Sequence, residues 1–100
     1  MLETEYQAAR LLSAVANSLR FRIVLELGRK PCTPTELAKK LKRSLPRVSY
    51  HLALLRRGDA VRFKAHGPRH QVIYWLKHPK VLQLCKDALE CVHGIRQVER

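Results

Sequence analysis

Residues 43–58 read RSLPRVSYHLALLRRG, and this stretch predicts a helix with two different faces. Its apolar residues Val48, Leu52 and Leu55 recur at the spacing of one helix face, so they would pack on a core. The arginine, serine and tyrosine side chains of its first two turns would point away from that core. We therefore expect the outward face to contact a partner outside the chain.

Charge is the strongest signal in the composition of the 100 residues. Lys and Arg number 20 against 8 Asp and Glu, which gives a formal net charge of +12 and a pI near 10.4. Such a balance indicates a polyanionic partner, either nucleic acid or an anionic membrane surface. We expect a cytoplasmic protein without a membrane partner. No apolar run approaches the ~18 residues of a membrane span, and the acidic start at residues 1–5 does not resemble a signal peptide.

The basic residues are concentrated in the middle third of the chain. Residues 39–70 contain one acid, Asp59, and the following basic residues: Lys39, Lys40, Lys42, Arg43, Arg47, Arg56, Arg57, Arg62, Lys64 and Arg69. A membrane-binding helix would carry its basic residues on one amphipathic segment, whereas these residues span several predicted elements. The distribution therefore favours nucleic acid.

Capping signals predict the helices around the opening stretch. A first helix is expected to open at Thr4, and a second is expected to be capped at Asn17 and to end at Gly28. The segment Thr33–Glu36 combines a capping box with an early proline and predicts the start of a short third helix. Ser44 is the expected N-cap of the helix described above.

The periodicity changes after this helix. Apolar and basic residues alternate over 61–65, a turn follows at 66–70, and a β-rich run occupies 71–76, which together predict a hairpin. A last helix is expected to begin at Pro79 and to end near Gly94. Two short helices joined by a tight turn and followed by a basic hairpin are typical of a winged helix-turn-helix.

The predicted fold class is therefore α+β, mainly α, with about five helices and a two-stranded hairpin wing. We expect one domain over 1–100, with the helix-turn-helix at 33–57, the wing at 60–77 and a dimerisation helix at 79–93. The residues expected to face double-stranded DNA are Lys42, Arg43, Ser44, Pro46, Arg47, Ser49, Tyr50, His51, Lys64, His66, Arg69 and His70. For His51, a half-buried position with a local hydrogen bond is an equal alternative.

The sequence resembles the ArsR/SmtB group of winged-helix repressors over roughly residues 9–77. The shared elements are ANSLR at 16–20 followed by Ile23, ELA at 36–38, and V-S-x-H-L-x-x-L at 48–55. This last element, with Ser44 before it, is the most specific of them. The resemblance implies a dimer whose first and last helices form the interface.

The last predicted helix supports a dimer on its own evidence. It carries a broad apolar stripe that one small core would not need in full. The expected interface residues, with one from the first helix, are Leu12, Leu84, Cys85, Ala88 and Val92. The alternative is a terminal helix that simply covers its own core.

No cofactor and no metal ion is expected. Metal sensors of the family often carry Cys-x-Cys where this chain has Thr33-Pro34-Thr35, and their ligand patterns in the last helix are missing here. Of the cysteines, Cys85 and Cys91 are too far apart on one helix to form a disulfide with each other. Buried, inert thiols are the commoner outcome, but a redox pair through Cys32 or across a dimer stays open.

No pattern of residues indicates an enzyme, since the sequence lacks a phosphate loop, paired carboxylates and a metal-protease motif. The predicted function is a sequence-specific regulator of transcription, a repressor, that binds a two-fold symmetric operator as a homodimer. The alternative is an architectural protein that coats DNA with weak specificity, which the charge would suit equally well. A winged helix used for protein contacts is a third reading, disfavoured by the basic hairpin tip.

Overall fold

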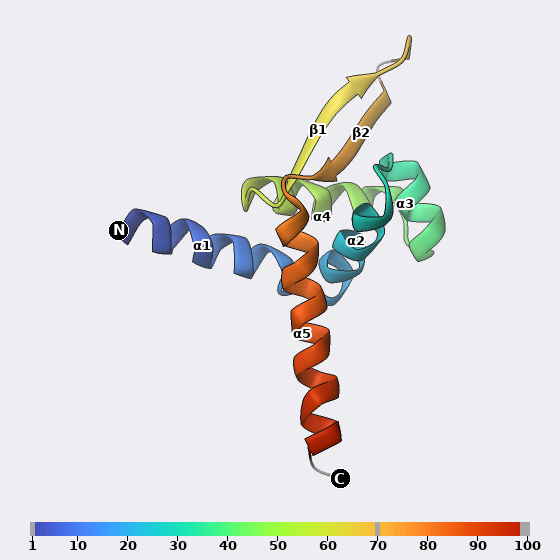
Figure 1. The fold of residues 1–100 in the computed structure, drawn as a ribbon. Helices are drawn as coiled ribbons and strands as arrows, with labels where there is room; N and C mark the ends of the chain where they lie inside the picture. Colours follow the sequence, from blue (N-terminus) through green and yellow to red (C-terminus); the bar gives the residue numbers. More distant parts are fainter. Residues whose placement is uncertain (1, 70, 99–100) are drawn as a thin grey trace.

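A computed structural model describes residues 2–69 and 71–98 of the chain. The elements in this part are α1 (Leu2–Val15), α2 (Ser18–Arg29), α3 (Pro34–Leu41), α4 (Leu45–Arg57), β1 (Val61–His66), β2 (Gln71–Leu76) and α5 (Pro79–Val98). In Figure 1, α2, α3 and α4 gather at the centre, while the hairpin, α1 and α5 extend from it in three directions. The five helices and the hairpin confirm the predicted winged helix-turn-helix.

The hairpin is antiparallel, and its register runs from the pair Val61↔Leu76 at the base to His66↔Gln71 near the tip. A short bridge adds the segment before α3 to this sheet. The amide of Cys32 donates to the carbonyl of Tyr74 at 3.0 Å, and the Tyr74 amide donates back at 2.8 Å. The wing is therefore fastened to the segment before α3 as well as to the end of α4.

The predicted caps of three helices are confirmed. The Asn17 side chain accepts hydrogen bonds from the first amides of α2 at 3.0 and 3.1 Å. Thr33 and Glu36 form a reciprocal capping box with distances of 3.1 and 2.8 Å. Ser44 accepts from the Arg47 amide at 3.3 Å and so begins α4. Because these side chains bind amides that lack partners inside the helix, they fix where each helix begins.

The inward face of α4 lies at the centre of the core. Val48, Leu52 and Leu55 have no exposed surface, as the helical spacing predicted. They belong to a buried cluster with residues from all five helices and β1, against which Tyr74 and Leu76 of β2 pack. From α2, Ile23 and Val24 are also completely buried. The position of α4 is thus fixed by packing along its whole inner side.

Two predicted helix boundaries are wrong because contacts outside the local sequence signals decide where these helices begin and end. The first helix already includes Leu2, so Thr4 is not its N-cap; the Gln7 side chain instead donates to Glu3 at 3.3 Å. The second helix passes through Gly28 and ends at Arg29. A Cβ atom at Gly28 would lie 2.6 Å from Leu82 Cδ1, so this glycine serves the close approach of α2 and α5.

The last helix is also longer than predicted. It continues through Gly94 to Val98, and beyond the neighbouring residues and backbone of the helix itself, no atom of the described residues lies within 4 Å of the place a Cβ would take at Gly94. A glycine inside a helix lowers the stability by only about 0.5–1 kcal/mol relative to alanine, so a long helix can continue through it. In the described part of the chain, no helix is long and apolar enough to cross a membrane.

Candidate nucleic-acid interface

The N-terminal half of α4 presents an exposed polar face opposite the core. Pro46, Arg47, Ser49 and Tyr50 are all exposed, and the Tyr50 side chain is among the most accessible large groups at 63%. Capping by Ser44 fixes the first turn that carries Arg47. The two faces predicted for this helix are therefore present on opposite sides of it.

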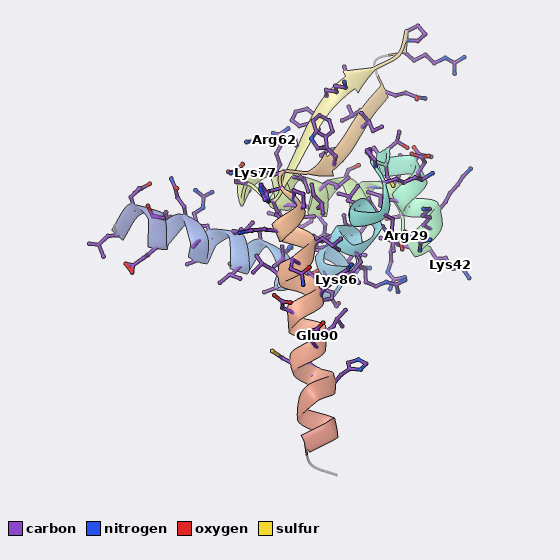
Figure 2. The ribbon with its side chains drawn as sticks, in the orientation of Figure 1. Arg29, Lys42, Arg62, Lys77, Lys86 and Glu90 are labelled. Carbon is purple, nitrogen blue, oxygen red and sulfur yellow. The ribbon has the colours of Figure 1, made fainter. Side chains whose placement is uncertain are left out.

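The turn between α3 and α4 adds two basic side chains next to this face. Lys42 ends α3 in the left-handed conformation, with φ 55° and ψ 50°. Figure 2 shows its side chain projecting from the end of α3 away from the other helices. Arg43 donates through Nη1 to the carbonyls of Leu41 at 3.1 Å and Lys42 at 3.2 Å, which holds its guanidinium against the turn.

His51 borders this face, since its ring meets the Tyr50 ring edge-on with centroids 5.2 Å apart. It is half-buried, and its Nδ1 lies 3.1 Å from Arg20 Nη1 on α2. Burial lowers the pKa of His51, and the charges of Arg20 and Arg47 lower it further. Arg20 also donates to the Ala14 carbonyl at 2.6 Å. His51 thus joins α4 to Arg20 of α2, which in turn binds the end of α1, and its contact with DNA stays a prediction.

The wing carries Lys64 and Arg69 as exposed side chains. Gly67 at its tip has φ +77°, a conformation that favours glycine, and leads the chain into the turn before Arg69. Of the other two wing residues expected to face DNA, His70 and the side chain of His66 lie outside the described residues.

Aromatic rings near the base of the wing form a contact that the sequence did not reveal. Phe63 and Tyr74 stack across the two strands with ring centroids 5.5 Å apart. The Arg56 guanidinium lies 4.6 Å from the centre of the Phe63 ring. In such a cation–π contact the cation is attracted to the electron-rich face of the ring. This contact therefore joins the end of α4 to the wing.

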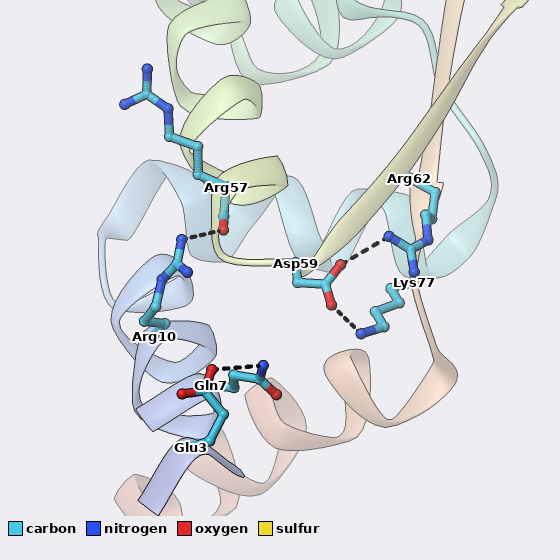
Figure 3. A network of polar contacts seen from close by, with 7 residues as sticks. All are labelled: Glu3, Gln7, Arg10, Arg57, Asp59, Arg62 and Lys77. Atoms are coloured by element: carbon cyan, nitrogen blue, oxygen red, sulfur yellow. Dashed lines mark hydrogen bonds and ion pairs between the residues drawn. The ribbon is translucent and has the colours of Figure 1, made fainter. Parts of the chain in front are cut away.

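Asp59 fixes the root of the wing. It forms ion pairs with Arg62, at 2.9 Å, and with Lys77, as Figure 3 shows. The hydrogen bond from Lys77 is the main cause of the lowered pKa of Asp59, and Arg62 adds to it. Nearby, Arg10 donates to the Arg57 carbonyl at 2.7 Å and joins α1 to the end of α4. The acid in the basic segment therefore has a structural role.

Apolar side chains are also exposed on α1 and on α5. Together we call them the apolar surface; they are Leu2, Tyr6 and Leu12 on α1, and Leu84, Ala88, Leu89 and Val92 on α5. The exposed fraction is 54% for Leu12, 39% for Leu84 and 50% for Val92. A groove of about 690 Å³ runs between α1, the end of α4 and the start of α5, and Leu84 lines it.

Cys85 does not belong to this surface, so its assignment to an interface is corrected. It is 1% exposed and packs in the chain's own core with Val81, because one edge of the apolar stripe of α5 turns inward. Burial raises the pKa of both Cys85 and Cys32. The thiol of Cys91 is exposed, and all three cysteines are unpaired. Among the described residues, no group of three or more potential ligands could hold a metal ion.

Fold and surface together define the class of this protein. A helix-turn-helix with an exposed basic recognition helix and a basic wing is the architecture of winged-helix DNA-binding proteins. Residues 15–62 match the family described as a helix-turn-helix domain. The chain belongs to the ArsR/SmtB family of winged-helix transcriptional regulators, which are not enzymes.

Three solved structures illustrate the similarity. The transcriptional regulator HlyU from Vibrio vulnificus is 32% identical, with a TM-score of 0.69 over 95% of this chain and 93% of its own. The transcriptional repressor PagR from Bacillus anthracis is 29% identical, with a TM-score of 0.76 over 86% and 97%. A homodimeric winged helix-turn-helix domain from Mycobacterium bovis has a TM-score of 0.79 over 98% and 87% at 24% identity, which shows the fold alone. No curated protein matches the sequence.

Proposed function

We propose that the chain is a sequence-specific repressor of transcription that binds a two-fold symmetric DNA site as a homodimer. The observation that carries this proposal is the exposed face of α4, where Arg47 and Tyr50 stand in the first turns of a helix fixed by its buried side. In helix-turn-helix proteins these turns enter the major groove. The similarity to PagR, described as a repressor, supports the same role here. Such a protein would act in the cytoplasm.

The residues proposed to contact DNA form what we call the basic surface: Lys42, Arg43, Ser44, Pro46, Arg47, Ser49, Tyr50, Lys64 and Arg69. Arg47 is the proposed base reader, because a guanidinium in the first turn can donate two hydrogen bonds to one guanine. Ser44 and Ser49 are short and suit phosphates. Arg69 at the wing tip would lie over the adjacent minor groove or its phosphates.

The proposed homodimer rests on the apolar surface. Leucine and valine side chains are exposed on α1 and α5. Burying them against a partner would stabilise the complex by about 25 cal/mol per Å² of apolar area removed from water. A second copy of the chain offers a matching surface, because a two-fold interface is formed by the same patch on both subunits. The Mycobacterium bovis domain of the same fold is described as homodimeric.

A competition assay tests the proposed function. The protein is bound to duplexes from the promoter region of its own gene and challenged with random duplex at about 150 mM salt. We expect affinity for the preferred duplex to exceed that for random duplex by more than about 10³-fold. A smaller ratio would favour the architectural alternative, in which the charge coats DNA without reading it.

A further inference from the structure

A small basic hollow lies beside the recognition helix, where the first turn of α2 meets the turn between α3 and α4. Its volume is about 290 Å³, and the residues that line it are Ser18, Leu19, Arg22, Leu41, Arg43 and Arg47. Three of these are arginines and none is acidic. Arg22, on α2, lies outside the segment where the sequence concentrates its basic residues.

The charges of these arginines are not balanced by carboxylates of the described residues. Elsewhere, acids neutralise basic groups: Lys40 pairs with Glu26 at 3.5 Å, and Asp59 pairs with two cations. Glu26 is one helical turn after Arg22 but contacts Lys40. The positive charges around the hollow repel each other. An anion bound within it would be attracted to each arginine and would offset this repulsion.

Arg43 is already oriented for such an anion. Its Nη1 is used by the carbonyls of Leu41 and Lys42, whereas among the described residues no hydrogen bond uses its Nε or Nη2. Those two donors form one edge of the planar guanidinium, which matches two oxygens of a phosphate. Because the side chain is held by the turn, little rotamer freedom remains to be lost on binding. The first amides of α2 are occupied by Asn17, so the arginines make the site.

We propose that this hollow binds a phosphate group, and that its source is the DNA backbone beside the groove that α4 enters. This inference rests on the proposed function. It adds Arg22 of α2 to the DNA contacts and gives Arg43 a defined partner. A backbone strand that passes the N-terminal end of a recognition helix lies within reach of residues beside that end. Arg47, exposed in the first turn of α4, also lines the hollow.

The test compares Arg22→Ala with Arg29→Ala, an exposed arginine at the other end of α2. Arg22→Ala should weaken binding to the preferred and the random duplex by the same factor, about three- to tenfold at 150 mM salt, and should lower the salt slope by about one. Arg22→Lys should keep the slope, and Arg29→Ala should change neither quantity. Circular dichroism shows whether each variant is folded.

An unchanged slope in folded Arg22→Ala would overturn the inference. Titration of the DNA-free protein with inorganic phosphate, followed by NMR of the arginine side chains, distinguishes the source. If phosphate binding depends on Arg22 while the DNA slope does not, the hollow is a site for a free anion, and the DNA assignment is wrong. Failure of the proposed function looks different: the unmutated protein then binds both duplexes equally, whatever Arg22 contributes to the slope.

Discussion

The basic surface and the apolar surface are both exposed, but they differ in chemistry and would bind different kinds of partner. On the basic surface, long cationic side chains surround a helix that packing holds rigidly from behind. On the apolar surface, leucine and valine side chains of two extended helices are exposed to solvent. The basic surface is suited to bind an anion, and the apolar surface is suited to pack against another apolar surface. Packing around α4 thus completes the core of one chain and leaves two separate surfaces exposed, for which the proposed partners are DNA and a second copy of the chain.

The largest expected effect is on the apolar surface. Charging its α5 part with Leu84→Glu and Val92→Glu should raise the dimer dissociation constant at least about 100-fold, or about 2.7 kcal/mol, because two carboxylates from each subunit would be buried without partners. Both side chains are exposed in the single chain, so each subunit should stay folded. Light scattering at tens of micromolar measures the change, and Lys86→Glu, on another side of α5, is the control. An unmutated protein that is monomeric in this experiment would remove the apolar surface from the account.

The next effect concerns the joint between the two surfaces. Gly58 ends α4, and a Cβ atom there would lie 2.3 Å from the Ala14 Cβ of α1. Gly58→Ala should therefore lower the free energy of unfolding by about 1–3 kcal/mol, since α1 must move. Gly94→Ala is the matched control, and it should raise the free energy by about 0.5–1 kcal/mol because that site is open. Urea unfolding measures both; equal effects would show that α1 is not packed closely on α4.

A smaller effect is expected at the tip of the wing. Arg69→Ala should weaken binding to all duplexes alike and lower the salt slope by about one, because its proposed contacts are to the backbone or to groove shape. Affinities measured over a range of salt concentrations, on the preferred and the random duplex, give this slope. A loss confined to one sequence would mean that the wing distinguishes bases.

The smallest effect is at the root of the wing. Asp59→Asn removes two ion pairs, but the Asp59 side chain is about half exposed, so screening should limit the loss of stability to between a few tenths and about 1 kcal/mol at neutral pH. Since the pKa of Asp59 is lowered on folding, its contribution is present above the ordinary aspartate range and is lost as the pH falls below about 4. The difference in the free energy of unfolding between the unmutated protein and Asp59→Asn, measured by urea unfolding, should therefore disappear in acid. A gap that widens there would contradict this role.

The sequence predicted the two faces of α4 because both depend on helical periodicity and on a cap within one short segment. It could not decide the position of His51, since the partner of that side chain, Arg20, is 31 residues away on another helix. Periodicity likewise predicts the apolar stripe of α5 but not which edge of it faces the core, so it cannot tell that Cys85 is buried. A glycine such as Gly28 is typical of a helix end, and its actual cause, the close approach of Leu82, is a tertiary contact that the local sequence does not show. Arg22 carries no sequence signal because only the folded chain brings it beside Arg43 and Arg47.

Binding-site selection with Arg47→Ala tests most directly whether the first turn of α4 reads DNA sequence. The selection is run in parallel with the unmutated protein and with Arg69→Ala. We expect Arg47→Ala to lose about 1–3 kcal/mol on the preferred site and to relax the preference at one position in each half-site, while Arg69→Ala selects the unmutated motif. If Arg47→Ala selects an unchanged motif and Arg69→Ala selects an altered one, the wing is the reader, and the account of α4 is wrong.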